Sequence, residues 1–334
     1  MHLLKSPLNR LLKTFVRRCV TVLIASSLAT ALTVAAQDFP NKPITLVAPF
    51  PTGSVTDTVT RTLGQALQEI LGQSVVVENR AGAQGTVGAA YVARSKPDGY
   101  TLLMASSGMF VARSFYKSLT YEPMESFQPV AGVGSTSMMF MVPEASPFKS
   151  MDDITKAARS DGAGVTIGFG SPSGQLALSL YSTAAKANPA PISYRGIPQA
   201  LTDLLGGHVK VAIVDIGSGV AQINSGKMRA LAISAQARSA SAPNVPTLEE
   251  VFPNVGVSLE TIIAVVAPAG TPPAVVQVLN NAILAALAKP EVKARFAGLN
   301  TAMLPLATHG LVQRLKNDNP KWEALIKQAG IALE

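Results

Sequence analysis

Cysteine is nearly absent from this sequence, and its absence excludes several kinds of chemistry. The 334-residue chain has a single cysteine, Cys19, which lies within a predicted export leader over residues 1–36. Once that leader is removed, the exported chain can have no disulfide, no thiolate nucleophile and no cysteine-ligated metal ion.

Histidine is also scarce, which argues against a metal or hydrolytic centre. Of the three histidines, His2 belongs to the leader, His208 lies in a glycine-rich turn and His309 follows an apparent helix start. We interpret His208 and His309 as solvated turn residues rather than as metal ligands or general bases. No Gly-x-Ser-x-Gly motif is present, so an exported hydrolase is the less favoured alternative.

The first 36 residues have the pattern of a secretory signal. An uncharged apolar run over 20–36 ends in small residues and follows five basic residues: Lys5, Arg10, Lys13, Arg17 and Arg18. This pattern predicts export to the periplasm with cleavage after about Ala36, and the run is short for a membrane span. The adjacent pair of arginines leaves both the Sec and the twin-arginine export routes open.

Removing the leader changes the charge of the protein. The whole chain has 28 Lys and Arg against 20 Asp and Glu, a net charge of +8. The leader takes five basic and no acidic residues, so 23 basic residues remain and the net charge falls to +3. The remaining basic residues do not cluster among aromatic ones, and we expect no nucleic-acid partner.

The 298 residues that remain exceed one ordinary hydrophobic core, so two domains are expected. Two βαβ blocks are separated by apolar strands near 137–142 and 261–267. The pattern predicts an α/β fold of two lobes, each a mostly parallel sheet flanked by helices. We place one lobe over 37–138 plus 265–334 and the other over 139–264, with a hinge and a cleft between them. Pro320 predicts a kink or break in the last helix.

The stretch over residues 44–57, ITLVAPFPTGSVTD, carries the first functional signal. A buried strand over 44–48 is followed by an open loop and by a helix that Thr56 or Asp57 can cap. Free loop amides and the positive end of the helix dipole would then suit a carboxylate or a phosphate. The alternative is an ordinary βα turn without a ligand.

Two further loops of the first block follow strands in the same way, around Ala83 and around Ser106. Because ligands bind outside the carboxyl ends of the strands in an open parallel sheet, three such loops together favour a ligand cleft. The expected ligand-binding residues of this block are Phe50, Thr52, Gly53, Ser54, Asp57, Ala83, Gln84, Ser106 and Ser107.

The second block has its own strand-end loops. A small polar loop is expected over 170–175, before a helix over 176–187, and an acid, Asp215, ends a later strand. The expected ligand-binding residues here are Ser171, Ser173 and Asp215.

Several motifs carry a family likeness. They are FPNKPI at 39–44, PFPTGSVTD at 49–57, LGQSVVVENRAGAQG at 71–85, PDGYTLL at 97–103, YRG at 194–196, LTDLLGG at 201–207 and APAGTP at 267–272. In these motifs the chain resembles the Bug-type solute receptors, the extracytoplasmic binding components of tripartite tricarboxylate transporters. The likeness spans nearly all of residues 39–334.

The resemblance implies a periplasmic binding protein of the Venus-flytrap fold, not an enzyme. It implies a small carboxylate-bearing organic acid or amino acid held between the lobes, chiefly by main-chain amides of the loops at 50–57 and 81–85. The implied partners are the inner-membrane permease subunits, and we expect a monomer without cofactor or metal. A receptor for a membrane sensor kinase is an alternative that the sequence does not separate from transport.

Two positions qualify the resemblance. The family usually has Gly-Gly in the first loop, where this chain has Gly53 and Ser54. Asp215 could pair with a ligand ammonium, as in the amino-acid receptors of the family, or it could cap the helix that follows it.

Overall fold

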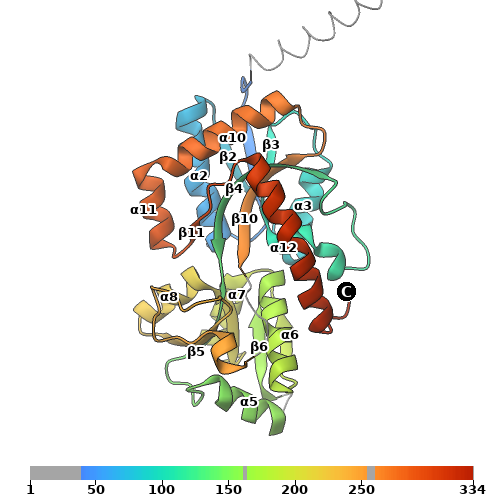
Figure 1. Ribbon diagram of the computed structural model, residues 1–334. Coiled ribbons are helices and arrows are strands. Elements are labelled where there is room, and N and C mark those ends of the chain that lie inside the picture. The colour runs from blue at the N-terminus through green and yellow to red at the C-terminus, as the bar shows by residue number, and fades with distance from the viewer. Residues whose placement is uncertain (1–38, 161–163, 254–259, 334) are drawn as a thin grey trace, which may run out of the picture. The chain divides into compact units, whose positions relative to one another are not determined.

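Two β-sheets, one in each of two lobes, organise the described chain (Figure 1). The computed structural model describes residues 39–160, 164–253 and 260–333, and the lobes belong to one compact unit that begins at Lys42. The predicted leader and its cleavage site lie outside the described residues. Within the described ranges, no helix combines the length and the apolar character needed to cross a membrane.

The first lobe contains a six-stranded sheet in the order β11-β4-β10-β3-β1-β2. Strand β1 pairs in parallel with both β2 and β3, whereas β10 pairs antiparallel with β3 and β4. The strands are β1 (Ile44–Ala48), β2 (Val75–Asn79), β3 (Thr101–Ser106), β4 (Phe127–Thr136), β10 (Thr261–Pro268) and β11 (Ala302–Met303).

The helices that accompany this sheet come from both ends of the chain. They are α2 (Val55–Leu71), the 3₁₀ turn η1 (Ala83–Gly85), α3 (Thr86–Ala93), α4 (Ser107–Phe110), η2 (Ala112–Ser114), α10 (Pro273–Ala288), α11 (Pro290–Gly298) and α12 (Thr308–Gln328). Helix α11 was not expected from the sequence.

The second lobe contains a five-stranded sheet in the order β7-β6-β8-β5-β9. Its strands are β5 (Met138–Pro143), β6 (Thr166–Phe169), β7 (Ala190–Ser193), β8 (Val211–Asp215) and β9 (Met228–Ile233). Its helices are α5 (Met151–Ser160), α6 (Pro172–Ala185), α7 (Ile197–Leu205), α8 (Ile216–Asn224) and α9 (Leu248–Val251). The two-lobed α/β prediction is confirmed. Both sheets are mixed rather than mostly parallel, because β5 and β10 run against their neighbours.

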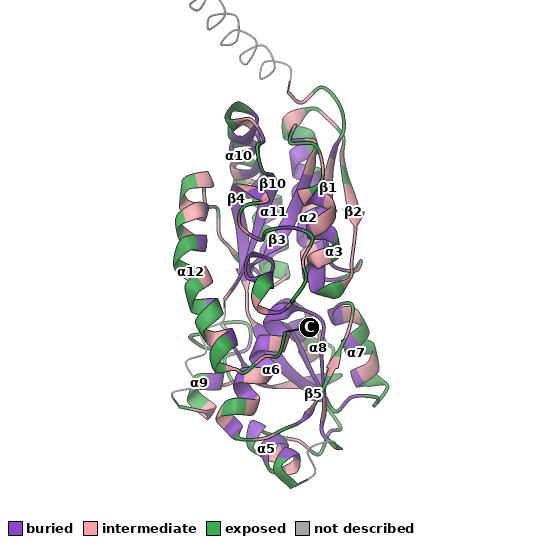
Figure 2. Ribbon diagram, turned by 90° about the vertical axis from the view of Figure 1, so that its right-hand side faces the viewer, coloured by how far each residue is buried: buried purple, intermediate pink, exposed green. Residues whose placement is uncertain are grey.

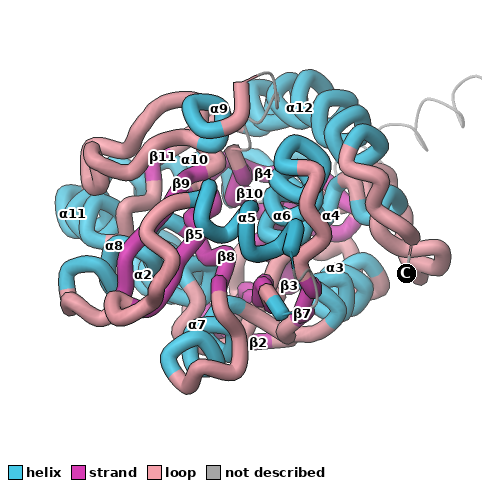
Figure 3. Tube along the Cα trace, turned by 90° about the horizontal axis from the view of Figure 1, so that it is seen from below, coloured by secondary structure: helices cyan, strands magenta, loops and turns pink. Residues whose placement is uncertain are grey.

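Strand β5 shows how the apolar sequence builds a two-sided core. Phe140 packs into one cluster with α5 and α6, while Met139 and Met141 pack into another with α7 and α8. Successive side chains of a strand point to opposite faces of the sheet, so a continuous apolar run is buried on both sides. Figure 3 shows the two helix pairs on either side of β5 and β8, and Figure 2 shows the buried strands of both sheets.

Helix α12 packs against both lobes. Leu311 and Leu315 join the core of the first lobe, and Trp322 and Ile326 join the core of the second. Figure 1 shows the helix running from beside β4 to beside α6. Of the kink or break predicted at Pro320, the break is wrong, since α12 is continuous across it, and the kink remains a prediction. The buried residues at both ends of the helix favour its continuation over the loss of one backbone hydrogen bond.

The predicted lobe limits at 138/139 and 264/265 remain a prediction. All of β10, from Thr261 onward, pairs within the first sheet, and all of β5 pairs within the second.

Candidate functional site

A cleft between the lobes gathers residues from the ends of strands and the beginnings of helices. It contains about 480 Å³ of space, including the open solvent at its mouth. Its lining consists of Phe50, Ser54, Val55, Thr56, Ser106, Thr136, Met138, Gly170, Ser171, Ser173, Ile197, Asp215, Thr261 and Ile263. Of the residues predicted from the sequence, the cleft brings together Phe50, Ser54, Ser106, Ser171, Ser173 and Asp215.

Three of the lining residues cap helices through side-chain hydrogen bonds. The side chains of Ser54, Ser171 and Asp215 accept hydrogen bonds from the first turns of α2, α6 and α8, respectively. The positive ends of three helix dipoles therefore point toward one cleft, and such ends favour a bound anion.

The start of α2 differs from the prediction. Ser54, not Thr56 or Asp57, is the N-cap, because its hydroxyl accepts from the Asp57 N–H at 3.1 Å. The N–H groups of Val55 and Thr56 follow this cap, and within the described chain neither has a protein acceptor. Both residues line the cleft, so these two amides are free for a ligand.

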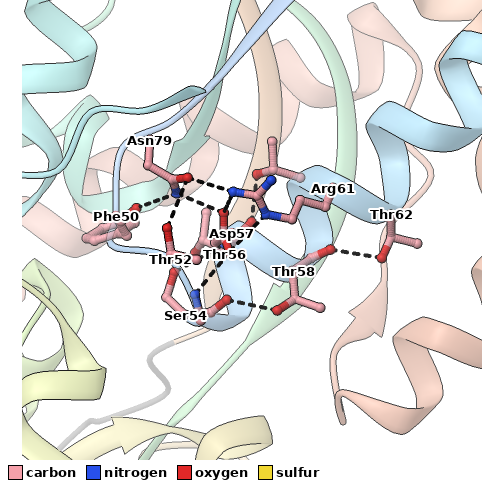
Figure 4. A network of polar contacts seen from close by, with 11 residues as sticks. Phe50, Thr52, Ser54, Thr56, Asp57, Thr58, Arg61, Thr62 and Asn79 are labelled. Atoms are coloured by element: carbon pink, nitrogen blue, oxygen red, sulfur yellow. Dashed lines mark hydrogen bonds and ion pairs between the residues drawn. The ribbon is translucent and has the colours of Figure 1, made fainter. Parts of the chain in front are cut away.

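Asp57 is buried beneath the first loop and holds it from inside (Figure 4). Its carboxylate accepts from the Gly53 N–H at 3.0 Å and from Asn79 Nδ2 at 2.7 Å, and it pairs with Arg61 at 3.0 Å. The Ser54 N–H donates to the Pro51 carbonyl. The expectation that the loop amides are free is therefore wrong for Gly53, Ser54 and Asp57.

Asn79, at the end of β2, extends this network to the loop backbone. Its Nδ2 also donates to the Phe50 carbonyl at 3.0 Å, and its Oδ1 accepts from Arg61 at 2.7 Å and from Thr52 at 3.3 Å. Thr52, like Gly53 and Asp57, does not line the cleft. These residues shape the loop, and a direct contact with a ligand remains only a prediction for them.

The loop around Ala83 contacts the second lobe instead of lining the cleft. Ala83 and Gln84 adopt left-handed backbone conformations, with φ of 42° and 51°, which are unfavourable for residues other than glycine. Gln84 Nε2 donates to Gln175 Oε1 at 2.8 Å. The contact joins the lobes, and it gives a reason for strained backbone at this position.

Ser107 also has a partner within the protein. Its hydroxyl accepts from the Ile262 N–H at 2.8 Å, so it fixes α4 to β10 and does not line the cleft. Ser106, directly before it, does line the cleft and is buried.

The prediction of a loop over 170–175 is wrong, because residues 172–175 are helical. Helix α6 begins at Pro172, with Ser171 accepting from the Gly174 N–H at 3.2 Å. Proline at the first helical position is favourable because its φ is already helical and it needs no hydrogen-bond acceptor there. The earlier start turns Ser173 into a residue of the first helical turn.

Several lining residues were missed from the sequence because they lie in strands. Thr136 ends β4 and Thr261 begins β10, and the two residues are register partners. Thr261 Oγ1 donates to Ser173 Oγ at 2.7 Å, a bond between residues 88 positions apart. A polar residue at the end of an apolar run, as at both positions, is a signal that could have indicated them.

The lobes touch closely at three glycines. A Cβ atom on Gly108 would lie 2.4 Å from Pro172, one on Gly196 would lie 2.5 Å from Pro51, and one on Gly217 would lie 2.1 Å from the Leu299 carbonyl oxygen. These distances are below any normal contact, so the present arrangement of the lobes requires glycine at these positions.

Asp215 is a buried acid at the cleft. Its Oδ1 accepts from the Ser218 N–H at 2.8 Å and its Oδ2 from the Ser218 hydroxyl at 3.1 Å, so the predicted capping role is present. Burial raises the pKa of the Asp215 carboxyl, and the bonds from Ser218 oppose that rise. Among the described lining residues none is Lys or Arg, so no cationic side chain of the lining balances this acid.

Replacing Asp215 with asparagine tests this electrostatic balance. Asparagine caps a helix about as well as aspartate does and carries no charge. Because the folded-state pKa of Asp215 is raised, its contribution to stability is greatest below the unfolded pKa and falls as the pH rises through the folded pKa. We expect D215N to raise the Tm of the ligand-free protein at pH 8, with the difference shrinking toward pH 4. A Tm difference independent of pH would contradict this assignment.

The described residues contain no group of three or more His, Cys, Asp or Glu side chains arranged to hold a metal ion. Both histidines are exposed, as expected; His208 lies in the turn after α7, whereas His309 is the second residue of α12.

Comparisons with known proteins agree on one family. A sequence model described as "Tripartite tricarboxylate transporter family receptor" matches residues 59–331. The UPF0065 protein in the tcbD-tcbE intergenic region of Pseudomonas sp. (strain P51) is 34% identical, over 93% of this chain and 94% of that protein. Protein BugT of Bordetella pertussis is 33% identical, over 91% of this chain and 94% of that protein.

Solved structures show the same fold. The periplasmic binding protein BugD has a TM-score of 0.84 at 31% identity, covering 89% of this chain and 100% of that chain. An R. palustris protein with adipate has a TM-score of 0.83 at 28% identity, with the same coverage. MatC from Rhodopseudomonas palustris with bound malate has a TM-score of 0.81 at 28% identity, covering 86% of this chain and 100% of that chain.

Proposed function

The chain belongs to the tripartite tricarboxylate transporter receptor family, and from this premise we propose that it captures a small carboxylate-bearing organic acid or amino acid between its lobes. Like its relatives, it is a solute-binding protein of the periplasmic type and not an enzyme. The observation that carries the proposal is the pair of free amides, Val55 and Thr56, at the start of α2 in the cleft.

A carboxylate fits these amides for electrostatic reasons. Two N–H groups at the positive end of a 17-residue helix can each donate to one carboxylate oxygen. Binding by amides without a cationic side chain also suits a receptor that must release its ligand, because full charge pairing is not involved. The adipate and malate bound to structural relatives are acids of this kind.

The opposite wall supplies a different chemistry. Asp215 can accept a hydrogen bond from a ligand ammonium or hydroxyl, and it would repel a second carboxylate placed against it while it is ionised. An acid that also carries such a donor would therefore match both walls, with its carboxylate at α2 and its donor near α8.

Lobe closure would bury the ligand and present one composite face to an inner-membrane permease. The contacts between the lobes, such as Gln84 with Gln175, would form only in the closed state. Export to the periplasm through the predicted leader and delivery to a permease complete the proposed role.

A thermal-shift screen of the protein without its leader tests this function. The panel is succinate, malate, adipate, citrate, L-aspartate, L-glutamate and benzoate, with glucose and MgCl₂ as controls. An acid present at about 100 times its Kd stabilises the folded protein by about 2.7 kcal/mol, which raises the Tm by several degrees. Stabilisation by glucose or MgCl₂ alone would refute carboxylate capture.

A further inference from the structure

The hydroxyl of Thr136 is buried at the cleft without a hydrogen-bond partner. Within the described chain, Thr136 Oγ1 is shielded from solvent and neither donates to nor accepts from any protein atom, yet the residue lines the cleft. A buried polar group without a partner is unfavourable, and in a native protein it calls for an explanation.

The polar groups around Thr136 are satisfied, which sets it apart. Ser135 Oγ, on the opposite face of β4, donates to Glu260 Oε1 at 2.6 Å. The Ser137 carbonyl accepts from the Ile216 N–H, and the Met138 N–H donates to Ser234 Oγ at 2.9 Å. Thr261, the register partner of Thr136, bonds Ser173. Among the described hydroxyls of the segment that crosses between the lobes, that of Thr136 is the one buried without a partner, and the residue that carries it lines the cleft.

The position of Thr136 places it between the two walls of the site. It ends β4 in the first lobe, and Met138, two residues later, is the register partner of Asp215 in the second. Residues two apart in an extended chain point to the same side, and both Thr136 and Met138 line the cleft. Thr136 therefore lines the same cleft as the amides of α2 and Asp215, on the segment that joins the two lobes.

We propose that Thr136 is a specificity-determining residue whose hydroxyl makes a hydrogen bond to a polar atom of the bound acid. This inference rests on the proposed function and adds a third point of recognition, on the crossing segment itself. An acid that places a methylene group at this point leaves the hydroxyl unsatisfied and binds more weakly, because a site built to make a hydrogen bond discriminates against an analogue that lacks the partner.

Two variants of nearly the same shape test the proposal. The probe is the acid of the thermal-shift panel that raises the Tm of the unaltered protein most, and its Kd is measured by titration calorimetry. We expect T136V to weaken binding about 10- to 100-fold, the loss typical of one hydrogen bond to a charged group. T136S, which keeps the hydroxyl, is expected to stay within about threefold. The Tm of ligand-free T136V should be unchanged or higher, because valine removes an unsatisfied polar group.

Thr155 provides the matched control. Its hydroxyl is buried but already donates to the Met151 carbonyl at 2.8 Å, in α5, so T155V should lower the Tm and leave the Kd unchanged. Two results would overturn the role of Thr136 while leaving the proposed function intact. One is equal affinity of T136V and the unaltered protein, and the other is an equal loss of affinity in T136V and T136S. Absence of binding by the unaltered protein to every acid would overturn both proposals.

Discussion

Replacing Gly217 with leucine is expected to abolish ligand binding while the protein still folds. Gly217 lies in the first turn of α8 in the second lobe. A Cβ atom there would lie 2.1 Å from the Leu299 carbonyl oxygen and 3.2 Å from Val55 Cγ2, both in the first lobe. Backbone atoms cannot yield to this contact, so the side chain would hold the lobes apart. The acid that best stabilises the unaltered protein should bind G217L at least about 100-fold more weakly, since the two walls no longer reach it together.

Gly298 supplies the control for this variant. It ends α11, is exposed and has a φ that other residues adopt, and a Cβ atom added to it would have no heavy atom within 4 Å, by contrast with Gly217. G298L should bind with unchanged affinity. Small-angle scattering should show a larger radius of gyration for G217L than for G298L in the presence of the acid. Normal affinity in G217L would show that the lobes need not approach as they do here.

Replacing Asp57 with alanine is expected to have the largest effect on stability. The change removes the acceptor of the Gly53 N–H, one of the two acceptors of the Asn79 amide, and the buried partner of Arg61. A buried donor left without an acceptor costs about 1–3 kcal/mol, whereas the Arg61 side chain is 48% exposed and can be solvated. Urea unfolding of ligand-free protein should show this loss. Because the same network sets the path of the first loop, the affinity for the acid should fall as well.

Asp152 is the matched control for Asp57. Both are aspartates in the first turn of a helix with a basic partner four residues later, but the Asp152 side chain is 64% exposed whereas that of Asp57 is 3% exposed. An exposed pair of this kind contributes about 0.3–0.5 kcal/mol, so D152A should unfold nearly as the unaltered protein does. A similar midpoint for D57A and D152A would show that the Asp57 network does not support the loop.

The strands illustrate how much of the fold could be predicted from the sequence. Strand β1 has the predicted bounds, 44–48, because apolar runs and the glycines and prolines that end them act within a few residues. Helix starts were less well predicted. Ser54 and Thr56 are both good caps by residue type. Which of them caps the helix depends on the path of the backbone after β1.

The candidate site was likewise predicted only in part from the sequence. The sequence by itself determined a two-lobed α/β receptor with polar loops at the strand ends, since periodicity, turn residues and family motifs are properties of the chain. Only the tertiary structure decided which loop amides are free, because Asp57 and Asn79 use some of them through bonds between separate elements. It also decided that Thr136 lies unsatisfied at the cleft and that Gly217 meets Leu299. Hydrogen-bond partners and close contacts between distant residues are set by packing, and no local pattern encodes them.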